Sequence, residues 1–392
     1  MKIQKLTIEG FRSLKKVEWS PGDLNVVIGQ NASGKSNLIA ALELLSASAR
    51  GRLSDYVISH GGMTELVWDN KAEGICFDAE ISEASNLERR IFEYKLDMRK
   101  RGNSNNYFFV DESAVTRFAS KISPETGFTN LLNRDTQSGM ILSEKTNDFE
   151  VVPDLPSAET LLSFAGNALG GNHWLPLLKK YQADWSVYND LFLHQGALMR
   201  QSAVTRYEKR LNSDGQNLAT VLHTLYTDRE FKSEIDLGMR AAFDEYEEVV
   251  FLPSASQRIE MGIRWRSLKN VQTAANLSDG TLRFLLLLTV LADSELPPLI
   301  VIDEPEIGLH PRMLPIVAEF AIDAARRSQI IFTTHSEAFL DAFREKRPTT
   351  TVVGMENGET TLKVVDDEEL AYWIKDFTLG DIFRSGTLEH IA

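Results

Sequence analysis

The chain has 392 residues, 43% of them hydrophobic and 25% charged, and its 56 acidic and 42 basic side chains give a net charge of −14. A chain of this length and apolar content can bury a sizeable core, which excludes disorder as its main state. The single cysteine, Cys76, excludes an intramolecular disulfide and a cysteine metal cluster, and the apolar stretch 284–292 is too short to span a bilayer.

The first thirty residues predict three short strands, over residues 3–8, 17–19 and 24–28. The start of the chain lacks the apolar centre of an export signal, so we expect a cytoplasmic protein. After residue 28 comes a polar loop that contains glycine, and residues 37–45 have the composition of a helix. The order is therefore strand, loop, helix.

That loop, Gly29-Gln30-Asn31-Ala32-Ser33-Gly34-Lys35-Ser36, fits the pattern GxxxxGK[ST]. Its glycines let consecutive N–H groups point inward, and the following helix adds its positive N-terminal end, so both favour bound phosphate. Lys35 would reach the β- and γ-phosphates, and the Ser36 hydroxyl would bind Mg²⁺. An ordinary glycine turn is the alternative, but the position between a strand and a helix favours the phosphate site.

From residue 51 to 250 the signals are weaker. Strands are expected at residues 74–81, 90–98 and 107–110, and the composition of residues 157–241 predicts helices with breaks at 170–171 and 212–215. No heptad pattern, internal repeat or low-complexity tract is present in the sequence.

From about residue 251 the pattern is α/β again. Residues 299–302 and 329–332 are short continuous apolar runs, as expected for parallel strands covered on both faces. The remaining predicted elements are a crossover helix over 311–327, a hairpin of 350–355 and 360–365 around Asn357-Gly358, and helix over the last 25 residues.

Two carboxylates and a histidine follow these apolar runs. Asp303 and Glu304 come directly after residues 299–302, which places them at the carboxyl edge of a parallel sheet, where ligands bind. Asp303 would complete a Mg²⁺ shell, and Glu304 would orient or deprotonate an attacking water. His335 follows the next strand; such a histidine is more often structural, but the shared edge favours a functional role.

A third segment, Ser278-Asp279-Gly280, precedes the apolar helix expected over residues 282–291. On spacing alone it is an N-cap, because Ser278 or Asp279 can accept from free N–H groups at the helix start. The alternative is that this helix end faces a γ-phosphate.

Four elements have now been described: the loop 29–36, the segment 278–280, the pair Asp303-Glu304, and His335. In this chain order they resemble an ATP-binding-cassette (ABC) ATPase of the RecF/SMC/OLD-like branch, and in particular a stand-alone AAA_21-like ATPase of bacterial repair or anti-phage defence. The resemblance assigns Walker A to Gly29–Ser36, the signature to Leu277–Thr281, Walker B to Leu299–Glu304, the D-loop to Pro305–Pro311 and the switch histidine to His335. Residues 8–14 and 214–219 are also similar to that branch.

The resemblance implies an α/β fold, an ABC-ATPase head of the P-loop class with an inserted mixed β/helical subdomain. The expected divisions are residues 1–80 for the N-terminal part of the head, 81–210 for the insertion, 211–345 for the C-terminal part of the head, and 346–392 for a C-terminal hairpin and helices.

The resemblance also implies the ligands, ATP and Mg²⁺, and a dimer in which two heads enclose two nucleotides. Lys35, Glu304 and His335 would carry catalysis, with His335 sensing the γ-phosphate, and Ser36 and Asp303 would hold the metal. The implied nucleotide contacts are Arg12, Asn31, Ala32, Ser33, Gly34, Lys35, Ser36 and Asn37 of one protomer and Ser278 and Gly280 of the other.

Two departures from the family pattern matter. Asp279 replaces the commoner signature glycine, so its charge must point away from phosphate or be offset. No glutamine occurs between Gln30 and Gln137, where the Q-loop glutamine is expected. Either another residue such as His60 takes its place, or hydrolysis is slow.

We expect an ATPase that drives or regulates a DNA-linked process, anti-phage defence or repair, as a homodimer or higher oligomer with a separately encoded effector such as a nuclease or a TOPRIM-like protein. One alternative is a nucleotide-dependent switch that inhibits a partner toxin or nuclease with little turnover. A transporter subunit is less favoured because of the long insertion and the missing glutamine, and no membrane partner is expected.

DNA remains a possible ligand, since residues 1–50 hold seven basic against four acidic side chains although residues 293–392 hold nine against nineteen. Candidate contacts are Arg89, Arg90, Arg99, Lys100 and Arg101, and Arg200, Arg206, Lys209 and Arg210, although solvated faces explain such clusters more often. The acidic run Asp366–Glu369 is expected to be a solvated helix start, so no nuclease activity of the chain itself is predicted.

Overall fold

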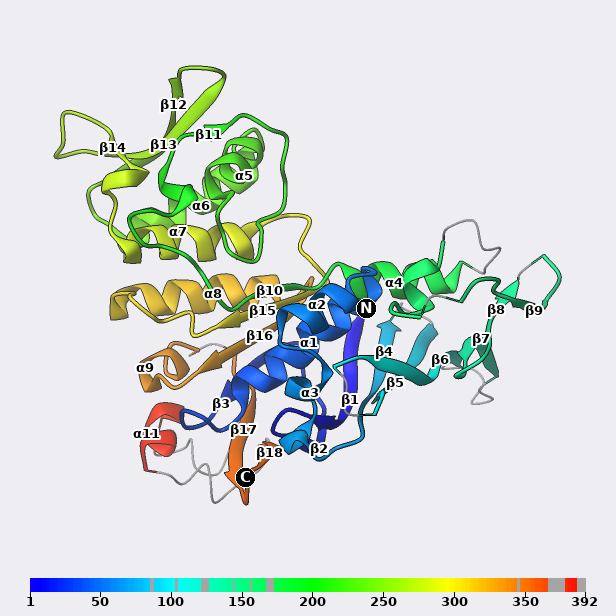
Figure 1. Ribbon diagram of the computed structural model, residues 1–392. Coiled ribbons are helices and arrows are strands. Elements are labelled where there is room, and N and C mark those ends of the chain that lie inside the picture. The colour runs from blue at the N-terminus through cyan, green and yellow to red at the C-terminus, as the bar shows by residue number, and fades with distance from the viewer. Residues whose placement is uncertain are drawn as a thin grey trace.

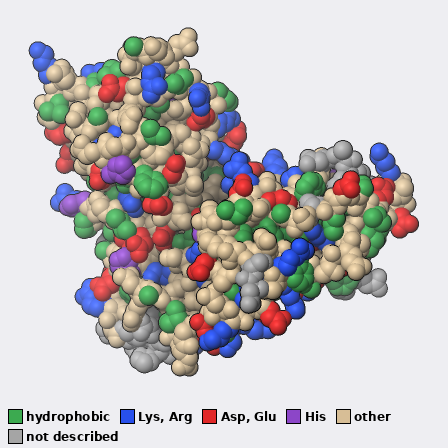
Figure 2. Space-filling view, viewed as in Figure 1, with side chains coloured by type: hydrophobic (Ala, Val, Ile, Leu, Met, Phe, Trp, Pro, Cys, Tyr) green, Lys and Arg blue, Asp and Glu red, His purple; other side chains and the backbone are tan. Residues whose placement is uncertain are grey.

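The computed structural model contains three sheets and the helices that cover them (Figure 1). It describes residues 1–84, 88–102, 105–120, 127–143, 145–155, 157–166, 173–343, 346–365 and 378–385. Figure 2 shows the resulting outline, with one lobe at the top and an arm to the right of the main body.

An eight-stranded antiparallel sheet begins at the N-terminus and runs into the arm, in the order β2-β1-β4-β5-β6-β7-β8-β9. Its strands are β1 (Lys2–Phe11), β2 (Leu14–Trp19), β4 (Gly74–Ala84), β5 (Glu88–Lys100), β6 (Tyr107–Ser120), β7 (Phe128–Arg134), β8 (Gly139–Ser143) and β9 (Asp148–Val151). Five of the predicted strands lie in this sheet. Because β4 crosses residue 80, the sheet continues without a break from the expected head into the expected insertion; the division itself stays a prediction.

A six-stranded sheet carries the motifs, in the order β10-β15-β16-β3-β17-β18. Its strands are β3 (Leu24–Ile28), β10 (Ser186–Tyr188), β15 (Leu299–Asp303), β16 (Gln329–Thr334), β17 (Thr349–Glu356) and β18 (Glu359–Val364). All neighbours are parallel except the predicted hairpin β17–β18. The hairpin is confirmed, and it forms the edge of this sheet because β17 pairs with β3.

Alternate residues of the central strands face two separate cores. Val26 and Ile300 pack with α7 (Asp279–Ala292) and α8 (Leu314–Ala324), whereas Val27 and Val301 pack with α1 (Lys35–Ala49). Strands buried on both faces need apolar residues at every position, which explains the continuous runs in the sequence. The crossover helix is confirmed as a short turn, Pro311–Met313, followed by α8.

The upper lobe holds the third sheet, β11 (Ala203–Val204), β12 (Tyr246–Ser254), β13 (Arg258–Trp265) and β14 (Gln272–Thr273), with α5 (Leu218–Leu225) and α6 (Arg229–Ala242) (Figure 1). The other helices are α2 (Leu53–Ser59), α3 (Met63–Leu66), α4 (Trp174–Ala183), α9 (Glu337–Leu340) and α11 (Leu379–Arg384). None of the helices in the described ranges is both long and apolar enough to cross a membrane.

The prediction of helix over residues 157–241 is wrong for residues 184–211, which precede the predicted break at 212–215. That segment contains β10, β11 and a single 3₁₀ turn, and is otherwise irregular. Its apolar side chains, among them Val187 of β10 and Met199 of the 3₁₀ turn, are nevertheless buried, so apolar content alone did not distinguish this segment from a helix. Of the helical prediction for the last 25 residues, α11 is confirmed, and Asp366–Glu369 lie outside the described residues.

Candidate nucleotide-binding site

The Walker A loop (residues 29–36) connects β3 to α1. Ala32 and Gly34 have φ of 64° and 110°, so the backbone passes twice through the left-handed region. The Lys35 ammonium lies inside the loop and donates to the carbonyls of Gly29 at 2.8 Å and Gln30 at 3.1 Å. Burial lowers the pKa of Lys35, and the nearby carboxylates of Glu304, Asp303 and Glu306 raise it in part.

The C-terminal hairpin supports this loop from below, a contact that the sequence did not indicate. Thr360 of β18 is buried and donates from its hydroxyl to the Ser33 carbonyl at 3.0 Å. A Cβ at Gly34 would overlap the Thr360 side chain, and one at Gly29 would overlap the Val353 carbonyl of β17. The hairpin therefore requires glycine at both positions, and the left-handed turn requires it again at Gly34.

Arg12 and Asn37 lie together beside the loop. Arg12 Nη1 donates to Asn37 Oδ1 at 3.5 Å, and Asn37 Nδ2 donates to Ser13 Oγ at 2.6 Å. Ser13 Oγ lies 2.6 Å from Thr360 Oγ1, so a chain of hydrogen bonds joins the end of β1, the start of α1 and the hairpin. Ser36 on the first turn of α1 is exposed, so its hydroxyl is accessible to a ligand.

The carboxylates and His335 meet the loop at one edge of the six-stranded sheet. Asp303 pairs with Thr333 across β15 and β16, and Thr334 pairs with Ile28 at the end of β3. His335 Nδ1 lies 2.9 Å from Glu304 Oε1. Glu304 has φ of 45°, and its N–H donates to the Thr333 carbonyl at 3.1 Å, which fixes the turn that aims the carboxylate at His335.

Two carboxyl groups at this edge are held by threonine hydroxyls. Thr333 Oγ1 donates to Asp303, and Thr334 Oγ1 donates to Glu306. Burial raises the pKa of both acids, and these hydroxyls lower it in part. Glu306 was missed as a site residue, although its place two residues after Glu304 in the turn is a signal that the sequence contains.

The signature segment begins α7 in the upper lobe. Ser278 is the N-cap, since its Oγ accepts from the Thr281 N–H at 3.1 Å, so the local prediction is confirmed. A Cβ at Gly280 would overlap the Gly308 carbonyl, which brings the D-loop against the signature. The structure does not place Ser278 and Gly280 in contact with the Walker A loop of the same chain.

Arg200 offsets the charge of Asp279, the departure seen in the sequence. Its guanidinium forms an ion pair with Asp279 and donates to the carbonyls of Leu193 and Leu277, each at 2.7 Å, and of Ala274 at 3.0 Å. Arg200 is 3% exposed, so its prediction as a DNA contact is wrong. The sequence analysis did not identify Arg200 as a residue that supports the signature segment, because no pattern near residue 200 points to residue 279.

Most of the remaining DNA candidates have partners within the described part of the chain. Side chains of this group are paired within the chain: Arg90 lies over Phe118 at 4.2 Å, Arg99 lies 3.5 Å from Glu73, Lys100 donates to the Asn70 carbonyl at 3.1 Å, Lys209 lies 2.6 Å from Glu295, and Arg210 lies 3.1 Å from Asp184. Arg101 and Arg206 are exposed, and the side chain of Arg89 lies outside the described residues. DNA contact by these residues stays a prediction.

The strand order shows which polar residue lies beside Walker B. Tyr188 of β10 pairs with Ile302, so Asn189 follows at the same edge as Asp303. Asn189 Nδ2 donates to Glu43 Oε1 of α1 at 2.8 Å. His60, the residue expected to replace the Q-loop glutamine, instead ends α2, where its Nδ1 lies 2.8 Å from the Tyr56 carbonyl.

A family model described as "AAA domain, putative AbiEii toxin, Type IV TA system" matches residues 24–341. The chain belongs to the AAA_21 family. This match spans all four motifs and confirms the AAA_21-like resemblance drawn from them. The AAA_21 family is one of P-loop ABC-type ATPases, which implies ATP and Mg²⁺ as ligands.

Curated relatives match this AAA_21 chain over segments. The DNA replication and repair protein RecF of Shewanella piezotolerans is 41% identical over 63 residues, 15% of this chain and 18% of RecF. The structural maintenance of chromosomes protein 3 of Caenorhabditis elegans is 26% identical over 177 residues, 42% of this chain and 13% of that protein. The chain thus spans less than a fifth of the length of these relatives.

Solved structures show the fold. An SMC head bound to the C-terminal winged-helix domain of ScpA has a TM-score of 0.53 at 14% identity and covers 95% of this chain and 100% of its own. An SMC head domain with an extended coiled coil, bound to the C-terminal domain of ScpA and derived from Pyrococcus furiosus, has a TM-score of 0.52 at 12% identity, with 96% and 99% covered. The predicted ABC head of the RecF/SMC type is confirmed.

Proposed function

We propose that the chain is an ATPase whose turnover drives or regulates a DNA-linked process, bacterial anti-phage defence or repair, together with a separately encoded effector. The observation that carries this proposal is the placement of Glu304 and His335, 2.9 Å apart, at the sheet edge that also holds Asp303 and the Walker A loop. A water-activating carboxylate, a γ-phosphate sensor and a phosphate loop are the parts that phosphoryl transfer to water needs.

The loop fits a phosphate chain. Its lysine is already inside the loop, where an anion would replace the carbonyls of Gly29 and Gln30 as partners of the ammonium. The first N–H groups of α1 have no partner within the helix and point at the same space. Ser36 and Asp303 are oxygen ligands of the kind that Mg²⁺ takes beside phosphates, and Mg²⁺ neutralises charge on the transferred group.

The residues around the Walker A loop then divide into those that bind the nucleotide and those that act on the attacking water. Lys35 binds the β- and γ-phosphates, and Arg12 with Asn37 binds the nucleotide at the side of the loop. Glu304 orients and deprotonates the water, while His335 holds the Glu304 carboxylate in position and contacts the γ-phosphate. Asn189 follows β10 at the edge beside Asp303, so we infer that it, rather than His60, takes the place of the missing Q-loop glutamine and orients water on the metal side.

A second head would complete the site. Ser278 and Gly280 lie on α7, away from the Walker A loop of their own chain, and the fold is that of SMC heads. We propose that they reach the γ-phosphate held by the partner, with Arg200 keeping Asp279 from repelling it. The ScpA domain on the SMC heads supports a partner protein as effector. A switch with little turnover is the second candidate, favoured by the shorter Asn189 in place of glutamine.

The test is ATP binding and hydrolysis by the purified protein. Lys35→Ala removes the ammonium that binds phosphate, so ATP affinity should fall by about 100-fold or more and hydrolysis should stop. Lys71→Ala, which removes an exposed lysine far from the loop in sequence, is the matched control. Unchanged affinity in Lys35→Ala would contradict the proposal. Turnover stimulated by DNA separates the ATPase from the low-turnover switch.

A further inference from the structure

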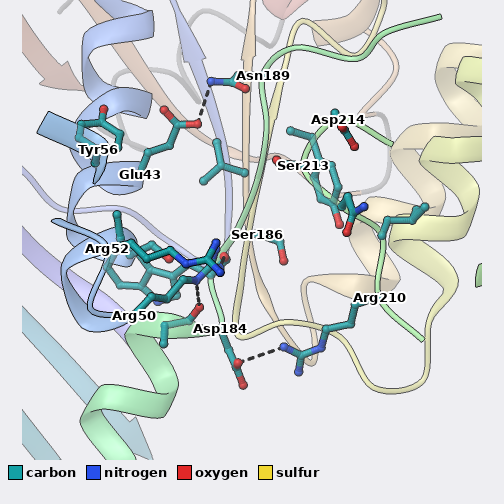
Figure 3. Close-up of a pocket in the computed structure, with 18 of the residues that line it drawn as sticks. Glu43, Arg50, Arg52, Tyr56, Asp184, Ser186, Asn189, Arg210, Ser213 and Asp214 are labelled. Carbon is teal, nitrogen blue, oxygen red and sulfur yellow. Dashed lines mark hydrogen bonds and ion pairs between the residues drawn. The ribbon is translucent and has the colours of Figure 1, made fainter. Parts of the chain in front are cut away.

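A cavity of about 810 Å³ lies between α1 and α2 on one side and the chain around β10 and residues 210–214 on the other (Figure 3). Small-molecule sites have volumes of about 300–1,000 Å³. The wall begins on α1 at Glu43, about two turns after Lys35, so the cavity is separate from the Walker A loop. It lies in the cleft between the upper lobe and the main body.

Guanidinium groups gather at one end of this cleft. Arg50 donates from Nε to the Ala183 carbonyl at 2.6 Å and from Nη2 to the Trp185 carbonyl at 2.7 Å, so both acceptors are neutral. Arg52 is exposed and has no ion pair within the described part of the chain. Figure 3 shows Arg50 and Arg52 on one wall and Arg210 on the facing wall.

Three carboxylates also line the cavity, Glu43, Asp184 and Asp214, but Figure 3 shows Glu43 and Asp214 away from the arginine end. Asp184 lies 3.1 Å from Arg210, and it is the one carboxylate in ion-pair range of the three arginines in the described ranges. Burial lowers the pKa of Arg50; the positive charges of Arg52 and Arg210 lower it further, and Asp184 raises it in part. Like charges held together in a cleft favour a bound anion, and guanidinium groups bind phosphate through paired N–H donors.

The rest of the wall suits a nucleoside. Tyr56 and His60 stack with their ring centroids 4.1 Å apart and line the α2 side of the cavity. A flat aromatic wall packs well against a nucleobase. Ser213 and Asp214, on the opposite wall, provide oxygen atoms for hydroxyl groups (Figure 3).

The far end of the cleft touches the catalytic edge. Glu43 and Asn189 both line the cavity and are joined by a hydrogen bond of 2.8 Å. Asn189 follows the strand that pairs with Walker B, and the charge of Asp303 contributes to the raised pKa of Glu43, after burial as the main cause. A molecule in the cleft would therefore contact residues next to the metal ligand.

We propose that this cleft binds a nucleotide-sized ligand that carries phosphate, with the phosphate on Arg50, Arg52 and Arg210 and the base beside Tyr56 and His60. Its binding changes the rate of ATP hydrolysis through Glu43 and Asn189. Ligand binding in the cleft does not depend on the proposed function. The change in ATPase rate, which we call the rate half of the proposal, rests on the proposed function.

Binding is tested in Lys35→Ala protein, in which the Walker A loop no longer holds nucleotide. Calorimetric titration with AMP and with pyrophosphate should show one site per chain. Adding Arg52→Gln should weaken that site by about tenfold, since one charged hydrogen-bonding partner is lost. Arg229→Gln, which removes an equal charge from the exposed start of α6, should have no effect. Absence of binding, or equal affinity with and without Arg52, would overturn the proposal.

Two further arms decide the ligand and its effect. A short single-stranded DNA that binds through Arg52 while AMP and pyrophosphate do not would overturn the small-ligand proposal in favour of a nucleic-acid surface. In protein with an intact Walker A loop, AMP should change the ATPase rate, and Arg52→Gln should remove that response while the basal rate stays the same. A wild-type rate that is indifferent to AMP overturns the rate half, whereas a wild type without any ATPase activity overturns the proposed function and leaves the binding result readable.

Discussion

As the proposed Mg²⁺ ligand, Asp303 must be charged, yet its burial opposes that charge. Burial raises its pKa above the ordinary 3.8, and the Thr333 hydroxyl and the Lys35 ammonium offset this in part. An acid with a raised pKa ionises at higher pH, so ATPase activity should fall on the acid side at a pH above the ordinary aspartate range. Mg²⁺ and the proton compete for the carboxylate. A tenfold rise in Mg²⁺ concentration should therefore move the acid limb of the pH–activity profile to lower pH, by up to about one pH unit. Profiles of kcat/KM for ATP at two Mg²⁺ concentrations measure this shift; a limb that stays in place belongs to another group.

Arg200 and Asp279 illustrate how unequal the two partners of an ion pair can be. Arg200 is buried and donates to three backbone carbonyls, whereas the Asp279 side chain is 66% exposed. Arg200→Met leaves those carbonyls without a donor and should lower the free energy of unfolding by about 1–3 kcal/mol. Asp279→Asn removes one exposed charge and should cost about 0.5 kcal/mol or less. Urea unfolding of both variants checks the difference, and equal costs would contradict the assigned role of Arg200.

At the scale of elements, the hairpin β17–β18 acts on the site through one hydroxyl. Thr360→Val keeps the shape of the side chain but loses the bonds to Ser33 and Ser13, so the Walker A loop should hold ATP less well. We expect the KM for ATP to rise by about 5- to 10-fold with a smaller change in kcat, and Thr360→Ser to restore it. Thr361→Val, one residue further on the exposed face of β18, is the control. A change in kcat without a change in KM would contradict a role of Thr360 in holding the Walker A loop for ATP binding.

The elements that carry sequence motifs were predictable, and those that join them in space were not. The strands before Gly29 and Asp303 are continuous apolar runs, a pattern that burial on both faces requires. β10 has three residues and no such run, so its pairing with β15, and with it the place of Asn189, follows only from the folded chain. The same holds for Arg200 with Asp279 and for Thr360 with Ser33, because contacts across 79 and 327 residues leave no local pattern.

At the scale of the whole molecule, the proposed ATPase needs two copies. Glu304→Gln keeps the size of the side chain but removes the base, so ATP should bind and persist, and closed dimers should accumulate. Light scattering with ATP and Mg²⁺ should report twice the monomer mass for this variant and a smaller dimer fraction for the wild type. A variant that stays monomeric while it holds ATP would contradict the paired heads and leave the single-chain site intact.

The order of the six-stranded sheet also determines when a newly made chain can first hold nucleotide. Leu24 of β3 pairs with Ile330, and Asn25 pairs with Thr349, so both neighbours of the strand that carries Walker A are made roughly 300 residues after it. At about 5–20 residues per second, the ribosome delivers them some 15 to 60 s later. Until then Val26, Val27 and Ile28 lack the strands that bury them, and Gly29 and Gly34 lack the hairpin beneath them. We therefore expect that a growing chain cannot bind ATP until translation has passed β18.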